Sequence, residues 1–309
     1  MAAPWLVGRE ILPGNCRVLH IRDKSHSATI GLRERRMSAW DKLLKQPHPR
    51  GHFVQLYEAD EAALTKNVGQ YLWEGLQQGD GVLVIAAAEH QQIFCRHLDG
   101  LGADLAAALG SQQLVFWDAE QTLTQIMTGG QPDWHMFETV IRSAMRLVRP
   151  AKGREGLRAY GEMVGILWKS RQFAAAIRLE QLWNKLLEQS CFSLYCAYSI
   201  DLFGKEFAVA NLDGVLCTHT HLVPAQPDGT LEAALNRSMD EILGSKADAL
   251  RILIKANYRP GWAVMPAAEA IVLWLRRNLP EQADQIVARA RYHYRSLLPP
   301  VVESGLAAE

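Results

Sequence analysis

The sequence predicts an α/β protein: a three-layer, mostly parallel sheet with helices on both faces, followed by an all-helical module. Three observations predict this class. Short apolar runs alternate with amphipathic stretches across residues 52–198. Residues 82–86 are apolar at every position, as expected for a parallel strand that is covered on both faces. Beyond Pro224 the apolar residues recur only at helical spacing, so no further strand is predicted there.

The predicted sheet begins at residues 52–57, a short apolar strand. The next segment repeats apolar residues at helical spacing from Leu64 to Leu76, with Asp60 as the candidate N-cap. Gly79-Asp80-Gly81 then turns the chain into the strand at 82–86, which a second helix follows. This alternation of strand and helix is typical of a right-handed parallel sheet.

The remaining elements follow the same two patterns. Strands are predicted at residues 114–117, 157–162 and 192–198. Amphipathic helices are predicted at residues 134–148 and 172–189. In the C-terminal module, helices are expected to begin at Thr230, Ser245, Pro266 and Pro280. Each of these residue types is favoured at an N-cap or in the first turn of a helix.

Length and composition indicate a folded protein with one sizeable core and an appendage. The chain has 309 residues, of which 49% are hydrophobic and 21% charged. Its longest apolar run, residues 82–88, is far shorter than the ~20 residues that cross a bilayer. The N-terminus has no signal-peptide pattern, so we expect a cytoplasmic protein without membrane contact. The five cysteines include no CxxC pair, which favours neither a disulfide framework nor a structural zinc site.

Charge is unevenly distributed although the net charge is zero. Residues 1–50 hold 10 Lys or Arg against 4 Asp or Glu and end in a Pro-rich linker. This basic arm leaves a DNA-binding regulator open as an alternative, but no helix-turn-helix spacing accompanies it, so nucleic acid is not an expected partner. The predicted organisation is a basic arm and linker at 1–50, a sheet domain at 51–227 and a helical module at 228–309.

Two glutamates are the candidate polar groups of a pocket. Glu162 follows a predicted strand, at the edge where open α/β sheets place their ligands, and it either enters the pocket or caps the next turn. Glu180 lies on the inward face of its helix together with Trp183, and a buried carboxylate needs a partner. Arg158 and Asn184 are the candidate partners, so Glu180 either contacts a ligand or locks the helix to the sheet.

A thiol, a phenol and two histidines follow further along the chain. Cys196 and Tyr198 share one face of a strand, where they either line an apolar ligand pocket or belong to the core. Cys217, His219 and His221 would form a metal site if their segment were a strand, whereas a helix, which we prefer, separates them. We therefore predict no metal and no cofactor.

Several of these segments resemble a known family. The segments are Gly161-Glu162-Met163-Val164 and residues 52–58, 180–184, 196–198 and 217–221. They are similar to the MEDS family, the sensory domain of methanogen and methylotroph regulators, over roughly residues 50–225. The resemblance implies a degenerate RecA-like, KaiC-like sheet with hydrocarbon derivatives as ligands. Tyr57, at the end of the first strand, is the better pocket candidate than His52, which adjoins the Pro-rich linker.

A site for nucleotide hydrolysis is not predicted. A RecA-like ATPase needs a glycine-rich loop that ends in Lys-Ser or Lys-Thr after its first strand, because backbone N–H groups and the lysine neutralise phosphate. This chain has Glu58-Ala59-Asp60-Glu61 at that position and no GxxxxGK[ST] motif. Its carboxylates repel a triphosphate.

The predicted function is signal transduction by a sensory domain that binds a small organic ligand without ATP hydrolysis and relays its state. The expected partner is a separate signalling protein, a kinase or regulator, or a second copy in a homo-oligomer. The alternative is a metal- or carboxylate-dependent enzyme that uses Glu162 and Glu180, although no catalytic residue is assigned. The predicted ligand-binding residues are Tyr57, Glu58, Glu162, Met163, Glu180, Trp183, Asn184, Cys196, Tyr198 and His219.

Overall fold

A parallel sheet of six strands organises the protein. The computed structural model describes residues 38–57, 61–224, 229–256 and 262–297, all within the compact unit formed by residues 37–309. The sheet has the order β3-β2-β6-β7-β1-β8, and every pairing in it is parallel. Its strands are β1 (His52–Tyr57), β2 (Gly81–Ala86), β3 (Leu114–Asp118), β6 (Leu157–Gly161), β7 (Ser193–Ser199) and β8 (His221–Val223). The predicted α/β class is confirmed.

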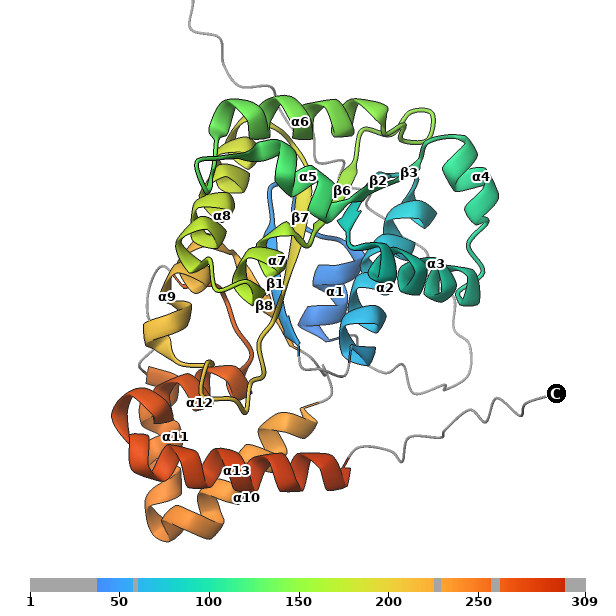
Figure 1. The fold of residues 1–309 in the computed structure, drawn as a ribbon. Coiled ribbons are helices and arrows are strands. Elements are labelled where there is room, and N and C mark those ends of the chain that lie inside the picture. The colour runs from blue at the N-terminus through green and yellow to red at the C-terminus, as the bar shows by residue number, and fades with distance from the viewer. Residues whose placement is uncertain (1–37, 58–60, 225–228, 257–261, 298–309) are drawn as a thin grey trace, which may run out of the picture. The chain divides into compact units, whose positions relative to one another are not determined.

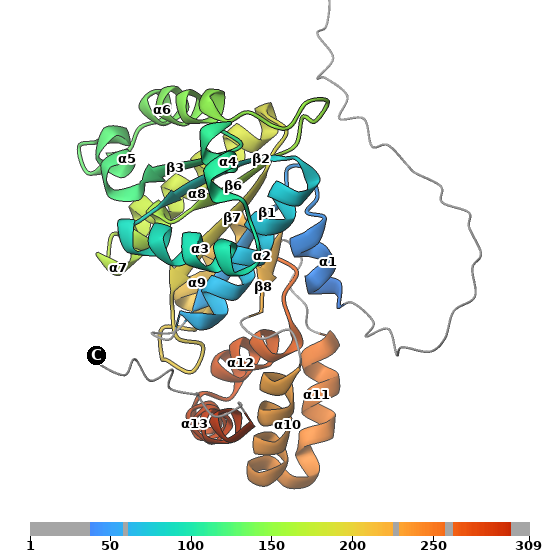
Figure 2. The same ribbon diagram turned by 90° about the vertical axis from the view of Figure 1, so that its right-hand side faces the viewer.

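Helices cover both faces of this sheet (Figures 1 and 2). One face carries α1 (Ala39–Lys45), α2 (Ala62–Gln78), α3 (Ala88–Gly100) and α4 (Leu105–Gly110). The other carries α5 (Ala119–Ile126), α6 (Trp134–Leu147), α7 (Met163–Lys169), α8 (Phe173–Gln189) and α9 (Val209–Thr218). Because successive strand residues point to opposite faces, Phe53 and Tyr57 of β1 join the first core, and Val54 and Leu56 join the second.

The predicted strands and long helices are present, and several short elements were not predicted. These are α1, α4, α5, α7, strand β8 and a two-stranded hairpin of β4 (Met127–Thr128) and β5 (Gln131–Pro132). Side-chain caps define two of the helix starts: Asp118 accepts from the Gln121 amide, and Asp133 accepts from the Met136 amide. Asp60, the predicted cap of α2, lies outside the described residues.

The C-terminal segment is helical, as predicted. It comprises α10 (Thr230–Leu243), a 3-10 turn (Gly244–Lys246), α11 (Ala247–Ala256), α12 (Ala267–Asn278) and α13 (Pro280–Leu297). The expected starts at Thr230, Pro266 and Pro280 are confirmed to within one residue, and Ser245 falls in the 3-10 turn. The boundary at residues 227–228 stays a prediction, since residues 225–228 lie outside the described part.

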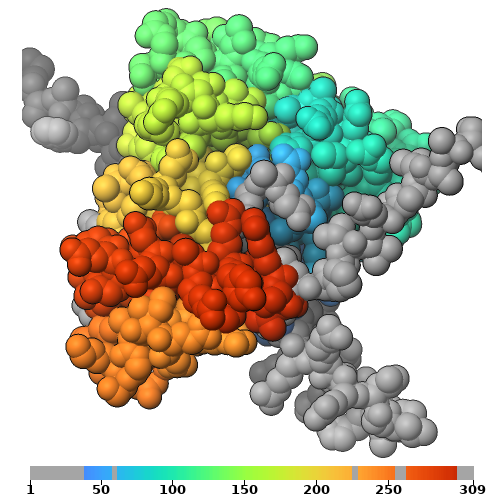
Figure 3. Space-filling view, turned by 60° about the horizontal axis from the view of Figure 1, so that its bottom comes forward, coloured from blue at the N-terminus to red at the C-terminus, as the bar shows by residue number. Residues whose placement is uncertain are grey.

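These C-terminal helices contact the segment around α9, which is yellow in Figure 3. Arg276 of α12 donates hydrogen bonds to the carbonyl groups of Phe203, Gly204 and Phe207. Val264, just before α12, pairs with His221 at the edge of the sheet. The helical segment is therefore joined to the sheet by backbone and side-chain hydrogen bonds.

Arg158 lies on the opposite face of the sheet from Glu180, so the predicted pairing of the two was wrong. Its guanidinium lies 2.9 Å from a carboxylate oxygen of Asp80 and donates to the carbonyl groups of Leu44 and Tyr71. The strand period explains the error, because Arg158 and Tyr160 point together toward α2.

Among the described residues, none of the helices is long and apolar enough to span a bilayer.

Candidate functional site

A histidine held between two carboxylates lies at the carboxyl edge of the sheet. Glu162 directly follows β6, and its side chain accepts from the Ala87 amide at 3.0 Å and from His90 Nδ1 at 2.7 Å. His90 Nε2 lies 2.9 Å from Glu61. Glu162 therefore bridges two strand ends instead of capping α7, where it makes no side-chain cap.

We call Glu61, His90 and Glu162 the edge cluster. Its histidine is protonated at neutral pH. Burial lowers the pKa of His90, but the hydrogen bonds and negative charges of Glu162 and Glu61 outweigh it and raise the pKa to about 9. The imidazolium is thus the dominant form at neutral pH. Tyr57 packs edge-on to His90 at a centroid distance of 6.3 Å, and burial beside both carboxylates raises the pKa of its phenol. Of the other residues predicted here, Met163 is buried in the core, and Glu58 lies outside the described residues.

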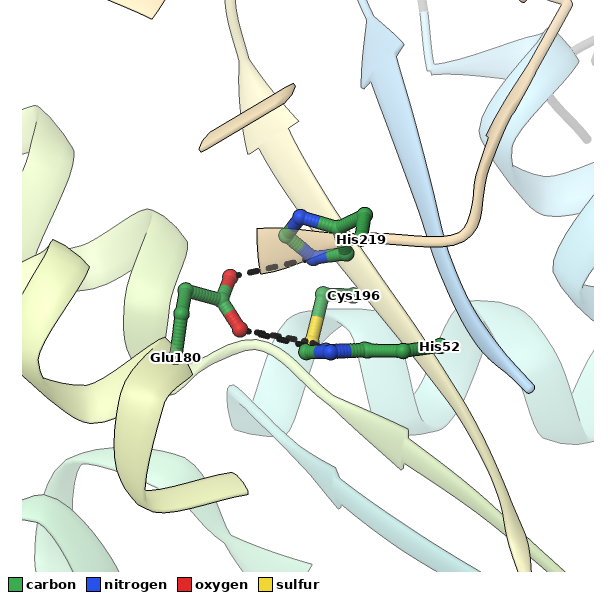
Figure 4. A group of neighbouring side chains, drawn as sticks. All are labelled: His52, Glu180, Cys196 and His219. Carbon is green, nitrogen blue, oxygen red and sulfur yellow. Dashed lines mark hydrogen bonds and ion pairs between the residues drawn. The ribbon is translucent and has the colours of Figure 1, made fainter. Parts of the chain in front are cut away.

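A second cluster lies inside the protein, between the sheet and α8 (Figure 4). We call it the inner cluster and define it as His52, Glu180, Cys196 and His219. Their side chains point toward one another, and all four are buried. Glu180 Oε2 lies 3.2 Å from His52 Nε2, and Glu180 Oε1 lies 3.3 Å from His219 Nε2. Cys196 Sγ lies 3.4 Å from His52 Nε2 and 3.7 Å from Glu180 Oε2.

Residues around the inner cluster fix the orientation of both imidazoles. Asn184 Nδ2 donates to the Thr218 carbonyl at 2.7 Å, so its Oδ1 faces His52 Nδ1 at 2.8 Å and must accept. His219 Nδ1 lies 2.7 Å from the Val215 carbonyl, which can only accept a hydrogen bond. Both Nδ1 atoms therefore carry a proton, and both Nε2 atoms face the carboxylate.

Glu180 is the anion of the inner cluster. Burial raises the pKa of Glu180, but His219 and His52 beside it outweigh burial and hold the pKa below its ordinary value. Burial and the neighbouring His219 lower the pKa of His52, which favours the neutral imidazole. Burial and Glu180 raise the pKa values of the Cys196 thiol and the Tyr198 phenol well above their usual ranges. The Tyr198 hydroxyl donates to Glu180 Oε1 at 2.5 Å.

The predicted site residues thus separate into two places. Glu180, Asn184, Cys196, Tyr198 and His219 meet at the inner cluster, whereas Tyr57 and Glu162 lie at the edge cluster. Glu162 and Glu180, the two carboxylates of the enzyme alternative, have separate sets of partners. Trp183 packs in the core against Phe137 and Phe192.

Sequence reasoning missed His52, and the preferred helical alternative correctly separated Cys217 and His221 from His219. Cys217 ends up exposed on α9, and His221 belongs to β8, so the alternating Cys-His-His set does not meet. His52 opens β1, and the two-residue period places it on the face of Val54, under α8. The two-residue period of β1 could have predicted that His52 faces α8. His52 was instead assigned to the neighbouring Pro-rich linker, so this signal was not used.

The described residues also form a cavity of about 460 Å³ away from both clusters. Its apolar lining includes Val209 of α9, Trp262, Met265, and Ala270, Ile271 and Trp274 of α12. Polar groups from α10 to α12 complete the wall: Glu232, Asn236, Arg251 and Arg277. None of the residues predicted to bind a ligand lines this cavity.

The match to a family model covers the sheet and both clusters. The model of the MEDS family, described as the methanogen/methylotroph, DcmR sensory domain, matches residues 51–220. The chain belongs to the MEDS family. Every residue of the edge and inner clusters lies within the matched MEDS segment, whereas most of the cavity lining follows it. A search of curated proteins found no match to the chain.

Membership of the MEDS family indicates a sensory role. The inner cluster offers four potential metal-ligand atoms, one from each residue, which lie within 4.8 Å of one another. The cavity instead offers an apolar wall with a few polar groups. These two features differ in the chemistry that they favour: the first suits a cation, and the second suits a small organic molecule.

Proposed function

We propose that this MEDS protein is a signal-transduction sensor that binds a small organic molecule in the cavity between α9 and the C-terminal helices. The cavity is the observation that carries the proposal, because about 460 Å³ lies within the range of ligand pockets. Its wall combines two indole rings and aliphatic side chains with a few polar groups. This composition suits a weakly polar compound, such as a hydrocarbon derivative.

Recognition without hydrolysis is the second part of the proposal. In a degenerate RecA-like sheet, the phosphate loop would follow β1. Glu61 and Glu162 place negative charge near that position, and the chain has no GxxxxGK[ST] motif. A triphosphate would be repelled there and would lack the backbone cradle and lysine that neutralise it.

Helix α9 is the proposed route from the cavity to the rest of the MEDS domain. Val209 at its start lines the cavity. Trp262, another lining residue, donates from Nε1 to Asp213 Oδ1 at 3.1 Å, and the Ala263 amide donates to the Leu216 carbonyl at 2.7 Å. A ligand that moves Trp262 would therefore bias the position of α9. A separate kinase or regulator, or a second copy of the chain, would bind differently to the protein when α9 has moved.

Thermal unfolding of the full chain with defined probes tests the proposal. The probes are methanol, methylamine, dichloromethane, butanol and octanol, each compared with ATP plus magnesium. We expect at least one organic probe to raise the melting temperature, whereas ATP with magnesium does not. Ala270→Leu, which fills the cavity, should remove the shift. Ala106→Leu, at an exposed position on α4, should preserve it.

Two results would contradict this function. The first is stabilisation by ATP with magnesium, which would mean that the sheet edge binds nucleotide despite its carboxylates. The second is a shift by an organic probe that is equally large in wild type and Ala270→Leu, which would place the ligand outside the cavity.

A further inference from the structure

We propose that the inner cluster is a binding site for one divalent transition-metal ion, with Zn²⁺ as the best-suited ion. The proposed ligands are His52 Nε2, His219 Nε2, a Glu180 carboxylate oxygen and Cys196 Sγ. Imidazole, carboxylate and thiolate are the three groups that bind zinc in proteins. This site is distinct from the cavity, since the two features share no residue.

The separations of three donor atoms fit a tetrahedral ion, and the fourth atom lies close to them. Bonds of about 2.0–2.3 Å place the corners of a tetrahedron roughly 3.3–3.8 Å apart. His52 Nε2 lies 3.2 Å and Cys196 Sγ 3.7 Å from Glu180 Oε2, and these two atoms lie 3.4 Å from each other. His219 Nε2 lies 3.3 Å from the other oxygen of the same carboxylate, Oε1. All four ligand atoms lie within 4.8 Å of one another. Only small side-chain shifts would bring them around one centre.

The second piece of evidence is a buried nitrogen that lacks a hydrogen bond. His219 Nε2 has no hydrogen-bond partner, although the ring is almost completely buried and the atom lies at ion-pair distance from Glu180. Because His219 Nδ1 already donates to the Val215 carbonyl, a neutral ring directs a lone pair at the carboxylate. Two acceptors that face each other in the interior are unfavourable unless a proton or a metal ion lies between them.

The surroundings supply the outer contacts that metal sites use. Metal-binding histidines almost always donate their other N–H to a carbonyl or carboxylate, which fixes the tautomer. Here His52 donates to Asn184 Oδ1 and His219 donates to the Val215 carbonyl. The Tyr198 hydroxyl donates to Glu180 and orients the carboxylate. Binding converts the Cys196 thiol to a thiolate: an S–metal bond replaces the S–H bond, and the proton passes to solvent.

The metal content of the full chain is the first test. The protein is purified without chelator, supplied with excess zinc, desalted and analysed by elemental mass spectrometry. We expect about one zinc ion per wild-type chain. Cys196→Ser and His219→Gln should reduce bound zinc at least tenfold, since even the loss of an outer-shell partner costs 10–100-fold in affinity. Cys95→Ser removes a thiol outside the cluster and should retain the zinc.

Cobalt spectroscopy uses only the wild-type protein, so its result does not depend on whether the variants fold. Co²⁺ in this site should give intense visible bands of a tetrahedral ion and a thiolate-to-cobalt charge-transfer band. Less than ~0.1 zinc per wild-type chain, or only the weak bands of octahedral cobalt, would overturn the proposal. Full zinc retention in folded Cys196→Ser and His219→Gln would also overturn it, because the ion would then lie elsewhere. In each of those cases the inner cluster is an ion pair between imidazolium and carboxylate.

Discussion

Glu180 is the residue on which the interior of the MEDS domain most depends. Its carboxylate is fully buried, and it contacts two histidines, a phenol and a thiol. We expect Glu180→Gln to lower the free energy of unfolding by roughly 3–5 kcal/mol, because the change leaves buried partners without their counter-charge. Urea denaturation measures the difference.

Glu188→Gln is the matched control for this change. Glu188 belongs to the same helix, α8, but its side chain is exposed. Its substitution should change the free energy of unfolding by less than about 0.5 kcal/mol. Equal effects of the two substitutions would show that the inner cluster contributes no specific stability.

His90 at the edge cluster predicts a pH dependence of stability. Its pKa rises from an ordinary value of 6.5 to about 9 in the folded state, so folding favours the protonated ring. The contribution is fully present below about pH 6.5 and is lost as the pH rises through about 9. Since solvent screens Glu61, the partly exposed partner of His90, we expect a loss of about 1 kcal/mol or less.

The comparison with His90→Gln isolates this contribution. Urea denaturation at about pH 6 and about pH 9.5 gives the stability of both proteins at each pH. At the lower pH, the free energy of unfolding of wild type should exceed that of His90→Gln. At the higher pH, this difference in free energy should be smaller. A gap that widens with pH would contradict a protonated His90 between Glu61 and Glu162.

At the scale of elements, the contact between α7 and β7 depends on a glycine. A Cβ atom at Gly165 would lie 2.7 Å from the Ala197 carbonyl oxygen, which belongs to the backbone of β7 and cannot move aside. We expect Gly165→Ala to destabilise the protein by roughly 1–3 kcal/mol, as overpacking of a core does. Gly110→Ala, at the end of α4 with open space around it, should stay within about 0.5 kcal/mol of wild type. Equal melting temperatures for the two variants would contradict this close packing.

The elements that sequence reasoning predicted are those with a long or uniform pattern. Residues 82–86 were predicted as a strand from their uninterrupted apolar run, which reflects the burial of both faces of β2. The apolar residues that recur at helical spacing over residues 173–189 predicted α8. The short helix α7 and the hairpin β4–β5 have too few residues to show a period. Their conformations depend on contacts with the rest of the fold.

The candidate site was predictable only in part. The two-residue period placed Cys196 and Tyr198 together, and the helical period placed Glu180 inward, and both are confirmed by their mutual contacts. The partners of Glu180 depend on strand order: β1 lies beside β7, so His52 reaches Cys196 across 144 positions of sequence. The order of parallel strands cannot be deduced from a period, so the sequence did not show that His52 lies beside Cys196.

At the scale of the whole molecule, α9 joins three features that are distant in sequence. Its first residue lines the cavity, and its Val215 and Thr218 carbonyls orient His219 and Asn184 at the inner cluster. Trp262, beyond the matched MEDS segment, contacts its middle through Asp213. Occupancy of the cavity and the state of the inner cluster should therefore influence each other through this helix.

Hydrogen exchange of the full chain tests the central claim, which is that a small organic ligand binds against α9 and the C-terminal helices. Mass spectrometry would compare the free protein with the protein saturated by the organic probe that stabilises it most. We predict increased protection of residues 209–218, 230–243 and 267–278, with little change at 81–86. Protection confined to residues 61–78 and 157–169, at the carboxyl edge of the sheet, would contradict the claim.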